Sequence, residues 1–129
     1  MHGNAYLLVK FFFSHHITMS QIETQYDMFL TSLSETIKNV DVNLMLKIMY
    51  LERILPDAAP HVELEIKLKS GINRAKKERD IRTKYGFQTS SLSEHGLFAV
   101  GQMSMNLVAE LANDSDIEKI SGMATPASY

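Results

Sequence analysis

The sequence predicts an α+β fold, with helices in the N-terminal part and an antiparallel sheet covered by helices in the C-terminal part. Three observations predict it. Apolar residues recur at helical spacing from Ile22 to Leu55, charged and apolar residues alternate from His61 to Lys69, and residues 56–60, which begin and end with proline, separate the two patterns. With 129 residues and 45% hydrophobic content, the chain is long enough to bury a core.

Residues 1–19 form an N-terminal arm whose structure the sequence leaves undecided. The stretch from Ala5 to Phe13 is apolar except for Lys10, which is too short for a membrane span. It also lacks the basic start and the small-residue cleavage pattern of a signal peptide. We therefore expect neither a signal peptide nor a transmembrane segment here, and the compartment stays open.

The region from 20 to 55 has the periodicity of a helix. Ser20 and Glu23 form a capping-box pattern at its start. Its apolar residues follow at steps of four, three and four: Ile22, Tyr26, Phe29, Leu33, Ile37, Val40, Leu44, Ile48, Leu51 and Leu55. One unbroken helix would carry these residues as an almost straight stripe. Asn39 and Asp41, which can end one helix and cap the next, instead favour a helical hairpin of about 20–38 and 42–55.

An apolar stripe of this length is not expected to remain exposed to water. It should cover the C-terminal sandwich within the same chain, or it should pair with a second copy to give a homodimer. In either case the predicted contact residues are Tyr26, Phe29, Leu33, Ile37, Leu44, Ile48 and Leu51.

The segment from 61 to 69 predicts a half-buried strand. Its even positions from 62 to 68 are apolar and its odd positions from 63 to 69 are charged, which is the period of a strand with one dry face and one charged face. Glutamate and lysine are weak strand formers, but a pattern sustained over eight residues outweighs a preference of under about 1 kcal/mol per residue. Leu64 and Ile66 are therefore expected to be buried, and Glu65 and Lys67 to be exposed.

The remaining elements are predicted from helical spacing, caps and turn residues. They are a helix, two strands, a second helix capped by Ser104 and a last strand, over residues 73–84, 87–92, 97–103, 105–112 and 117–121. Gly86 is placed to end the first helix in a left-handed cap. The resulting β-α-β-β-α-β order predicts a ferredoxin-like antiparallel sandwich over residues 61–123, followed by a C-terminal tail over 124–129.

Several stretches of this second part carry a family resemblance. Strand 97–103 lies in the segment GLFAVGQMS, the next helix ends in LVAELANDSD, and the last strand has two aliphatic residues, Ile117 and Ile120, three positions apart. Together with IKLKSG at 66–71 and the KYG helix end at 84–86, these stretches resemble subtilisin propeptides and related proteinase inhibitors. The resemblance covers residues 61–129.

The resemblance implies a binding function. Members of this family dock an open sheet face on the protease and pass an extended C-terminal tail through its substrate cleft. Here the tail residues would be Thr125, Pro126, Ala127, Ser128 and Tyr129. The implied role is that of an inhibitor or folding chaperone of a subtilisin-like serine protease. The alternative for these residues is a disordered terminus.

Other functions find little support in the sequence. The formal net charge of −2 gives no overall attraction to nucleic acid, and the eight cations between Lys67 and Lys84 are diluted by Glu78 and Asp80, which favours a solvated helix. The absence of cysteine excludes disulfides and thiol catalysis. The histidines lack further ligands at metal-site spacing, and no phosphate loop or nucleophile motif is present.

We therefore expect no catalysis, metal or cofactor. The alternative to protease binding is a non-catalytic regulatory or assembly module that oligomerises through its N-terminal helices.

Overall fold

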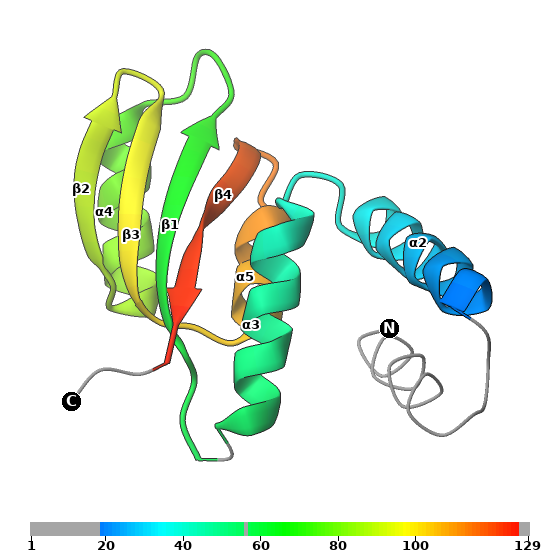
Figure 1. Ribbon diagram of the computed structural model, residues 1–129. Coiled ribbons are helices and arrows are strands. Elements are labelled where there is room, and N and C mark those ends of the chain that lie inside the picture. The colour runs from blue at the N-terminus through cyan, green and yellow to red at the C-terminus, as the bar shows by residue number, and fades with distance from the viewer. Residues whose placement is uncertain (1–18, 56, 127–129) are drawn as a thin grey trace. The chain divides into compact units, whose positions relative to one another are not determined.

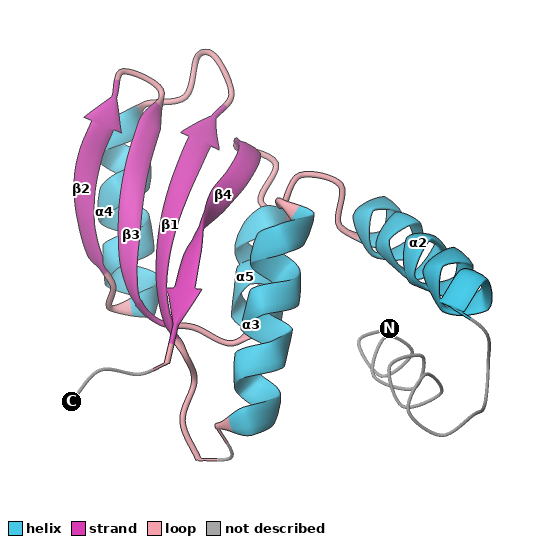
Figure 2. Cartoon of the chain, viewed as in Figure 1, coloured by secondary structure: helices cyan, strands magenta, loops and turns pink. Residues whose placement is uncertain are grey.

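The computed structural model describes residues 19–55 and 57–126, which form an α+β structure with a four-stranded antiparallel sheet (Figures 1 and 2). The elements are α2 (Met19–Thr36), α3 (Val42–Ile54), β1 (His61–Leu68), α4 (Arg74–Tyr85), β2 (Gln88–Ser93), β3 (Gly96–Gln102), α5 (Met105–Ala112) and β4 (Ile117–Thr125). The α+β class predicted from the sequence is confirmed. The break between α2 and α3 also rules out a single helix from 20 to 55.

The chain divides into two compact units, residues 1–38 and residues 39–129. The boundary falls between the two helices and not in the proline-bounded segment at 56–60. As a result, α3 belongs to the same unit as the sheet, whereas α2 belongs to the other unit.

The first helix of the described residues, α2, already includes Met19. Ser20 therefore lies inside the helix, and the prediction that it is the N-cap is wrong. The carbonyl of Ser20 accepts a hydrogen bond from the Thr24 hydroxyl at 2.9 Å, and the Ser32 carbonyl accepts one from Thr36 at 2.8 Å. These bonds bring hydroxyl groups back to carbonyls one turn earlier, as is common for threonine within helices.

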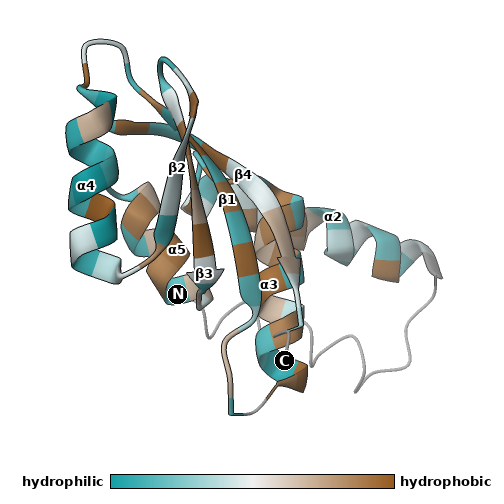
Figure 3. Ribbon diagram, turned by 90° about the vertical axis from the view of Figure 1, so that its left-hand side faces the viewer, coloured by the Kyte–Doolittle hydropathy of each residue, from teal (hydrophilic) through white to brown (hydrophobic). Residues whose placement is uncertain are grey.

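The strands of the second unit lie in the order β2-β3-β1-β4, and each neighbouring pair is antiparallel. The alternation predicted for β1 is confirmed: its residues are alternately buried and exposed along the whole strand. Leu64 and Ile66 have no exposed surface, whereas Glu65 and Lys67 are exposed. The sheet therefore has one dry face, and α4 and α5 lie on that side in both ribbon views (Figures 1 and 3).

Side-chain and glycine caps define the ends of the helices that cover the sheet; those at Gly86 and Ser104 were predicted, whereas Asn73, predicted as the first helical residue, is the N-cap. The Asn73 side chain accepts a hydrogen bond from the Lys76 N–H, and the Ser104 hydroxyl accepts one from the Leu107 N–H. Gly86 ends α4 with φ of 75°, as expected for a left-handed cap. Between the helices and the sheet lies a core that includes Val62, Leu64, Ile66, Leu68, Ile81, Leu97, Ala99, Met103, Val108, Leu111, Ile117 and Ile120.

The remaining helix of this unit, α3, comes first in the chain. It packs against β4 and touches α5. Just before it, Ile120 donates a hydrogen bond to the Asn39 carbonyl at 2.7 Å and accepts one from the Asp41 N–H at 2.9 Å, which gives a short parallel bridge along β4. Asp41 then caps α3 by accepting a bond from the Leu44 N–H, as its position in the sequence predicts. These bonds explain why the second unit begins at Asn39.

The last strand is longer than predicted. We expected it to end at Ser121 because a glycine follows, but β4 continues to Thr125. Gly122 has φ of 150°, and a Cβ atom at this position would lie 2.0 Å from the Glu63 carbonyl oxygen. The glycine therefore permits a close approach between β4 and β1 and does not end the strand.

Candidate functional site

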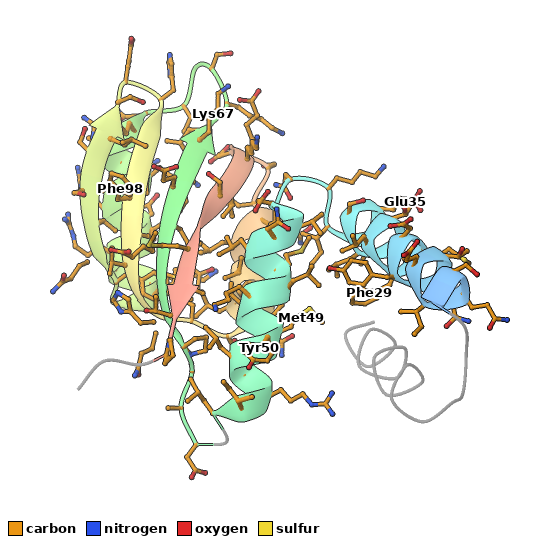
Figure 4. The ribbon with its side chains drawn as sticks, in the orientation of Figure 1. Phe29, Glu35, Met49, Tyr50, Lys67 and Phe98 are labelled. Carbon is orange, nitrogen blue, oxygen red and sulfur yellow. The ribbon has the colours of Figure 1, made fainter. Side chains whose placement is uncertain are left out.

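The face of the sheet opposite α4 and α5, which we call the open face, is the main candidate site. Figure 1 looks onto it, with α4 passing behind β2 and β3. Because residues alternate between the two faces, the strand registers assign to it the side chains of Glu63, Glu65, Lys67, Ser90, Phe98, Val100, Lys119, Ser121 and Met123. Figure 4 labels two of them, Phe98 on β3 and Lys67 near the end of β1.

Two carboxylates lie at the centre of the open face, between apolar neighbours. Glu63 is opposite Val100 on one side and Met123 on the other. Glu65 is opposite Phe98 and Ser121, and its Oε2 accepts a hydrogen bond from the Ser121 hydroxyl at 3.4 Å. Met123 is 58% exposed, which is high for a large apolar side chain within a sheet.

These side chains border a hollow of about 690 Å³, which Asp41 also lines. The Asp41 carboxylate already accepts a bond from the Leu44 N–H, so it is engaged in capping α3. Glu63 and Glu65 are the two carboxylates of the hollow that come from the sheet itself.

Positive charge is separated from these carboxylates along the strands. Lys67 lies directly opposite Lys119 in the pairing of β1 with β4, and the Lys67 ammonium is 3.2 Å from the Glu118 carboxylate. Like charges directly opposite each other on one face destabilise a sheet. The open face therefore carries acidic groups at its centre and basic groups at one end, where Glu118 partly offsets the repulsion between Lys67 and Lys119.

A second charged cluster lies on the far side of the unit and connects α4 to the loop before β4. The Lys77 ammonium is 2.9 Å from Asp114 Oδ2 and 2.8 Å from Asp116 Oδ2, and the Lys77 side chain is only 13% exposed. Burial by itself lowers the pKa of Lys77, but the hydrogen bonds and charges of the two aspartates together raise this pKa above its usual value. This cluster joins two elements and is structural.

The pKa of Asp114 is shifted in the opposite direction, below its usual value. Burial by itself raises the pKa of its carboxyl group, but the hydrogen bond from Lys77, the bond from the Asp116 N–H and the nearby charges of Lys77 and Lys84 bring the pKa below its usual value. Both members of the pair are thus held in their charged forms.

The predicted tail residues fall in different places. Thr125 is the last residue of β4 and pairs with His61, so it belongs to the sheet and not to an extended tail. Pro126 follows it and is exposed. Ala127, Ser128 and Tyr129 lie outside the described residues.

The predicted helix-contact residues are divided between the two units. Tyr26, Phe29 and Leu33 lie on α2, and Ile37 directly follows it. Leu44, Ile48 and Leu51 lie on α3 and are buried in the second unit, where α3 packs on β4 and α5. The three α3 residues therefore take part in an intramolecular contact with the sandwich.

Half of the basic residues of α4 have an acidic partner. Arg74 bonds Glu78 at 3.2 Å, Lys77 bonds the two aspartates, and the Lys84 ammonium lies 3.8 Å from Glu110. Among the residues that the structure describes, no group of three acidic or histidine side chains is placed to hold a metal ion. None of the described helices is long and apolar enough to cross a bilayer.

Sequence reasoning identified the charged face of β1 but missed its apolar partners. Phe98, Val100 and Met123 become neighbours of Glu63 and Glu65 only through the strand registers. The alternation of Leu97 to Val100 could have indicated that Phe98 shares a face with Val100, but nothing local in the sequence aligns them with Glu65 and Glu63.

Comparisons with protein-family models, with curated proteins and with solved structures find no significant match to this chain.

Proposed function

We propose that this chain is a propeptide-like inhibitor or folding chaperone of a subtilisin-type serine protease, and that it acts by binding and not by catalysis. The observation that carries the proposal is the open face, where the exposed Met123 and the half-buried Phe98 and Val100 surround two carboxylates. Apolar groups exposed together and bordered by charge are typical of surfaces that dock on another protein.

The topology supports the same proposal. We assign residues 61–123 to the ferredoxin-like class. The chain contains two β-α-β units, β1-α4-β2 and β3-α5-β4, and each is split by a strand of the other. In the sheet, β3 lies between β1 and β2, and β1 lies between β3 and β4. For residues 20–55 we propose the helical hairpin expected from their apolar spacing, with α2 and α3 as its two helices.

The chain leaves the sheet at a position that suits this function. β4 is hydrogen-bonded to β1, and Pro126 directly follows the pair formed by Thr125 and His61. A protein that docks on Glu63 and Met123 therefore lies close to the start of residues 126–129. In this proposal the tail adds to the substrate cleft as an extended strand, with Tyr129 in the specificity pocket.

The test is inhibition of a panel of subtilisin-type proteases with different specificity pockets. We expect competitive inhibition of at least one of them. Removal of residues 126–129, which spares Thr125 in the sheet, is expected to raise the inhibition constant at least about tenfold. Tyr129→Gly should account for much of this loss, because one pocket-filling aromatic usually dominates such contacts.

The open face is tested separately by charge reversal. Glu63→Lys combined with Glu65→Lys should weaken inhibition, whereas Asp57→Lys combined with Glu94→Lys, which makes the same change in net charge at exposed loop positions, should not. Equal inhibition by the full and the shortened chains, or no inhibition of any protease in the panel, would reject the proposal.

A second function is favoured by the division of the chain. Because α2 belongs to a different compact unit from the sheet, it is available in principle as an assembly element. In this alternative the chain is a regulatory or assembly module that forms a homodimer through its N-terminal helices. Of the residues predicted for the contact on α2, Phe29 and Leu33 are already buried within the chain, so the exposed Tyr26 would make it. Light scattering distinguishes the two, since Tyr26→Asp, a change at an exposed position of α2, should dissociate such a dimer and leave protease inhibition unchanged.

A further inference from the structure

One edge of the sheet offers a second binding surface, distinct from the open face. β2 is the outer strand of the sheet, and no described strand pairs with its outer side. On an edge strand every second residue points its N–H and C=O groups away from the neighbouring strand, which leaves them free to pair with another extended chain. Figure 3 looks onto this edge.

β2 lacks most of the devices that protect exposed edges. Its residues, QTSSLS, include no charge and no proline, and five of the six are exposed. One irregularity in its pairing with β3 falls between Ser91 and Ser93, so residues 88–91 form a regular segment. The opposite edge differs, because the bridge between Val40 and Ile120 covers part of β4.

The helix packed beneath this edge carries an excess of positive charge. α4 packs against β2 and contains six basic and two acidic residues, and Figure 3 shows it as largely hydrophilic. The Arg82 guanidinium donates a hydrogen bond to the Thr89 hydroxyl at 3.4 Å, which places its charge directly at β2. Arg79 lies three residues earlier, on the same side of the helix, and is exposed.

Other basic residues of α4 point away from β2. Lys77 bonds Asp114 and Asp116, and Lys84 approaches Glu110, so both face α5. Arg74 bonds Glu78 within the helix. Arg82 is thus the cation that a hydrogen bond places at β2, and Arg79 lies one turn before it.

We propose that the β2 edge binds an extended acidic segment of a partner protein, which adds to the sheet as a fifth strand beside β2. The main-chain groups of residues 88–91 pair with the backbone of the segment. Its acidic side chains on the helix side of the sheet meet Arg82 and Arg79. This surface does not depend on the open face or on the C-terminal tail.

A second copy of this chain is a poorer occupant of the same edge. Antiparallel pairing of two β2 strands would place the two α4 helices side by side across the symmetry axis. Each helix carries the same excess of basic residues, so the two would repel each other. An acidic segment has the opposite charge and avoids this cost.

The test uses the full chain and a fluorescein-labelled octapeptide in which valine alternates with glutamate. Fluorescence anisotropy is measured against a lysine version of the peptide and against an acidic version methylated at every internal backbone nitrogen, so that neither edge of the peptide keeps its N–H donors. We expect the acidic peptide to bind at least about tenfold more tightly than the lysine version, with an affinity that falls at high salt. Methylation should abolish binding, because it removes the donors that a new strand needs.

Variants of the chain locate the site. Arg79→Gln combined with Arg82→Gln should weaken binding about threefold to tenfold. The control is Lys47→Gln combined with Arg53→Gln, which makes the same change in net charge at exposed positions of α3 and should leave binding unchanged. Amide hydrogen exchange should slow within residues 88–91 when the peptide is bound.

Three results would overturn the proposal. They are equal binding of the acidic and lysine peptides, equal binding of the methylated and unmethylated acidic peptides, and exchange protection confined to elements other than β2. The methylated peptide keeps the test valid even if the arginine variants are unstable, because it leaves the protein unchanged.

Discussion

At the scale of single residues, position in the sheet decides what each side chain does. Leu64 and Glu65 are adjacent in the sequence, yet Leu64 has no exposed surface and Glu65 lies on the open face. A residue on the dry face contributes to the core, whereas a residue on the open face is available for binding. Substitutions on the dry face are therefore expected to change stability, and substitutions on the open face to change binding.

Leu64→Ala is expected to lower the free energy of unfolding by about 2–5 kcal/mol, since it removes a buried side chain and leaves a cavity. Glu65→Ala should be nearly neutral, because its one recorded bond, from the Ser121 hydroxyl, is exposed. Urea denaturation followed by circular dichroism measures both. A similar loss for the two variants would contradict the assignment of the faces.

The contact between Lys77 and Asp114 predicts how stability depends on pH. The pKa of Asp114 is below its ordinary value of 3.8, so its contribution is fully present above that pH and is lost as the pH falls through the lowered pKa. The pKa of Lys77 is above 10.5, so its contribution is fully present below that pH and is lost as the pH rises through the raised pKa. Stability should therefore fall at both extremes.

Lys77→Met tests this dependence, because it removes the partner that holds the pKa of Asp114 down. As the pH falls below the ordinary pKa of Asp114, the variant should lose less of its free energy of unfolding than the wild type does. Urea denaturation at a series of pH values measures this loss. Lys76→Met, at an exposed neighbouring position, is the control and should keep the wild-type slope. An unchanged slope in Lys77→Met would show that the contact does not set this dependence.

At the scale of elements, a hydrogen bond between two helices joins α3 to the sandwich. The Glu52 carboxylate on α3 accepts a hydrogen bond from the Met105 N–H in the first turn of α5. The Ser104 hydroxyl accepts a bond from the Leu107 N–H in the same turn. Two acceptors therefore satisfy N–H groups at the start of α5, and one of them comes from another helix.

Glu52→Ala is expected to destabilise the protein by roughly 0.5–2 kcal/mol, as the loss of other capping acceptors does. Glu52→Gln keeps an oxygen acceptor and should lose less, while Arg53→Ala, at an exposed neighbouring position, should be close to neutral. Thermal unfolding compares the three variants. If Arg53→Ala lost as much stability as Glu52→Ala, the loss would come from a general effect on α3 and not from the bond between Glu52 and Met105.

At the scale of the whole molecule, the second unit contains the elements that its core requires. Leu44, Ile48 and Leu51 on α3 are buried together with the sheet and its helices. The bridge at Asn39 and Asp41 attaches the start of the unit to Ile120. The unit from 39 to 129 should thus be independent of what precedes it.

A chain of residues 39–129 is expected to fold cooperatively, with a stability close to that of the full protein. A chain of residues 61–129, which follows the domain boundary predicted from the sequence, should be much less stable, because it lacks the helix that covers β4. Urea denaturation of the two chains gives the comparison. Equal stability would show that α3 contributes little to the core.

The sequence by itself determined the local features of this protein. Alternation identified β1 and its two faces, and the caps at Asp41, Gly86 and Ser104 marked where helices begin or end. Each of these features depends on residues a few positions apart, so the chain carries the signal locally.

The tertiary structure alone decided which distant residues meet. It joined α3 to the sheet, aligned Phe98 and Met123 with Glu65 and Glu63, and showed that Gly122 permits a close approach instead of a stop. Register and packing depend on the three-dimensional path of the backbone, and a shift of one residue would reverse the faces. The open face and the β2 edge, on which both proposals depend, follow from this assembly and from no segment alone.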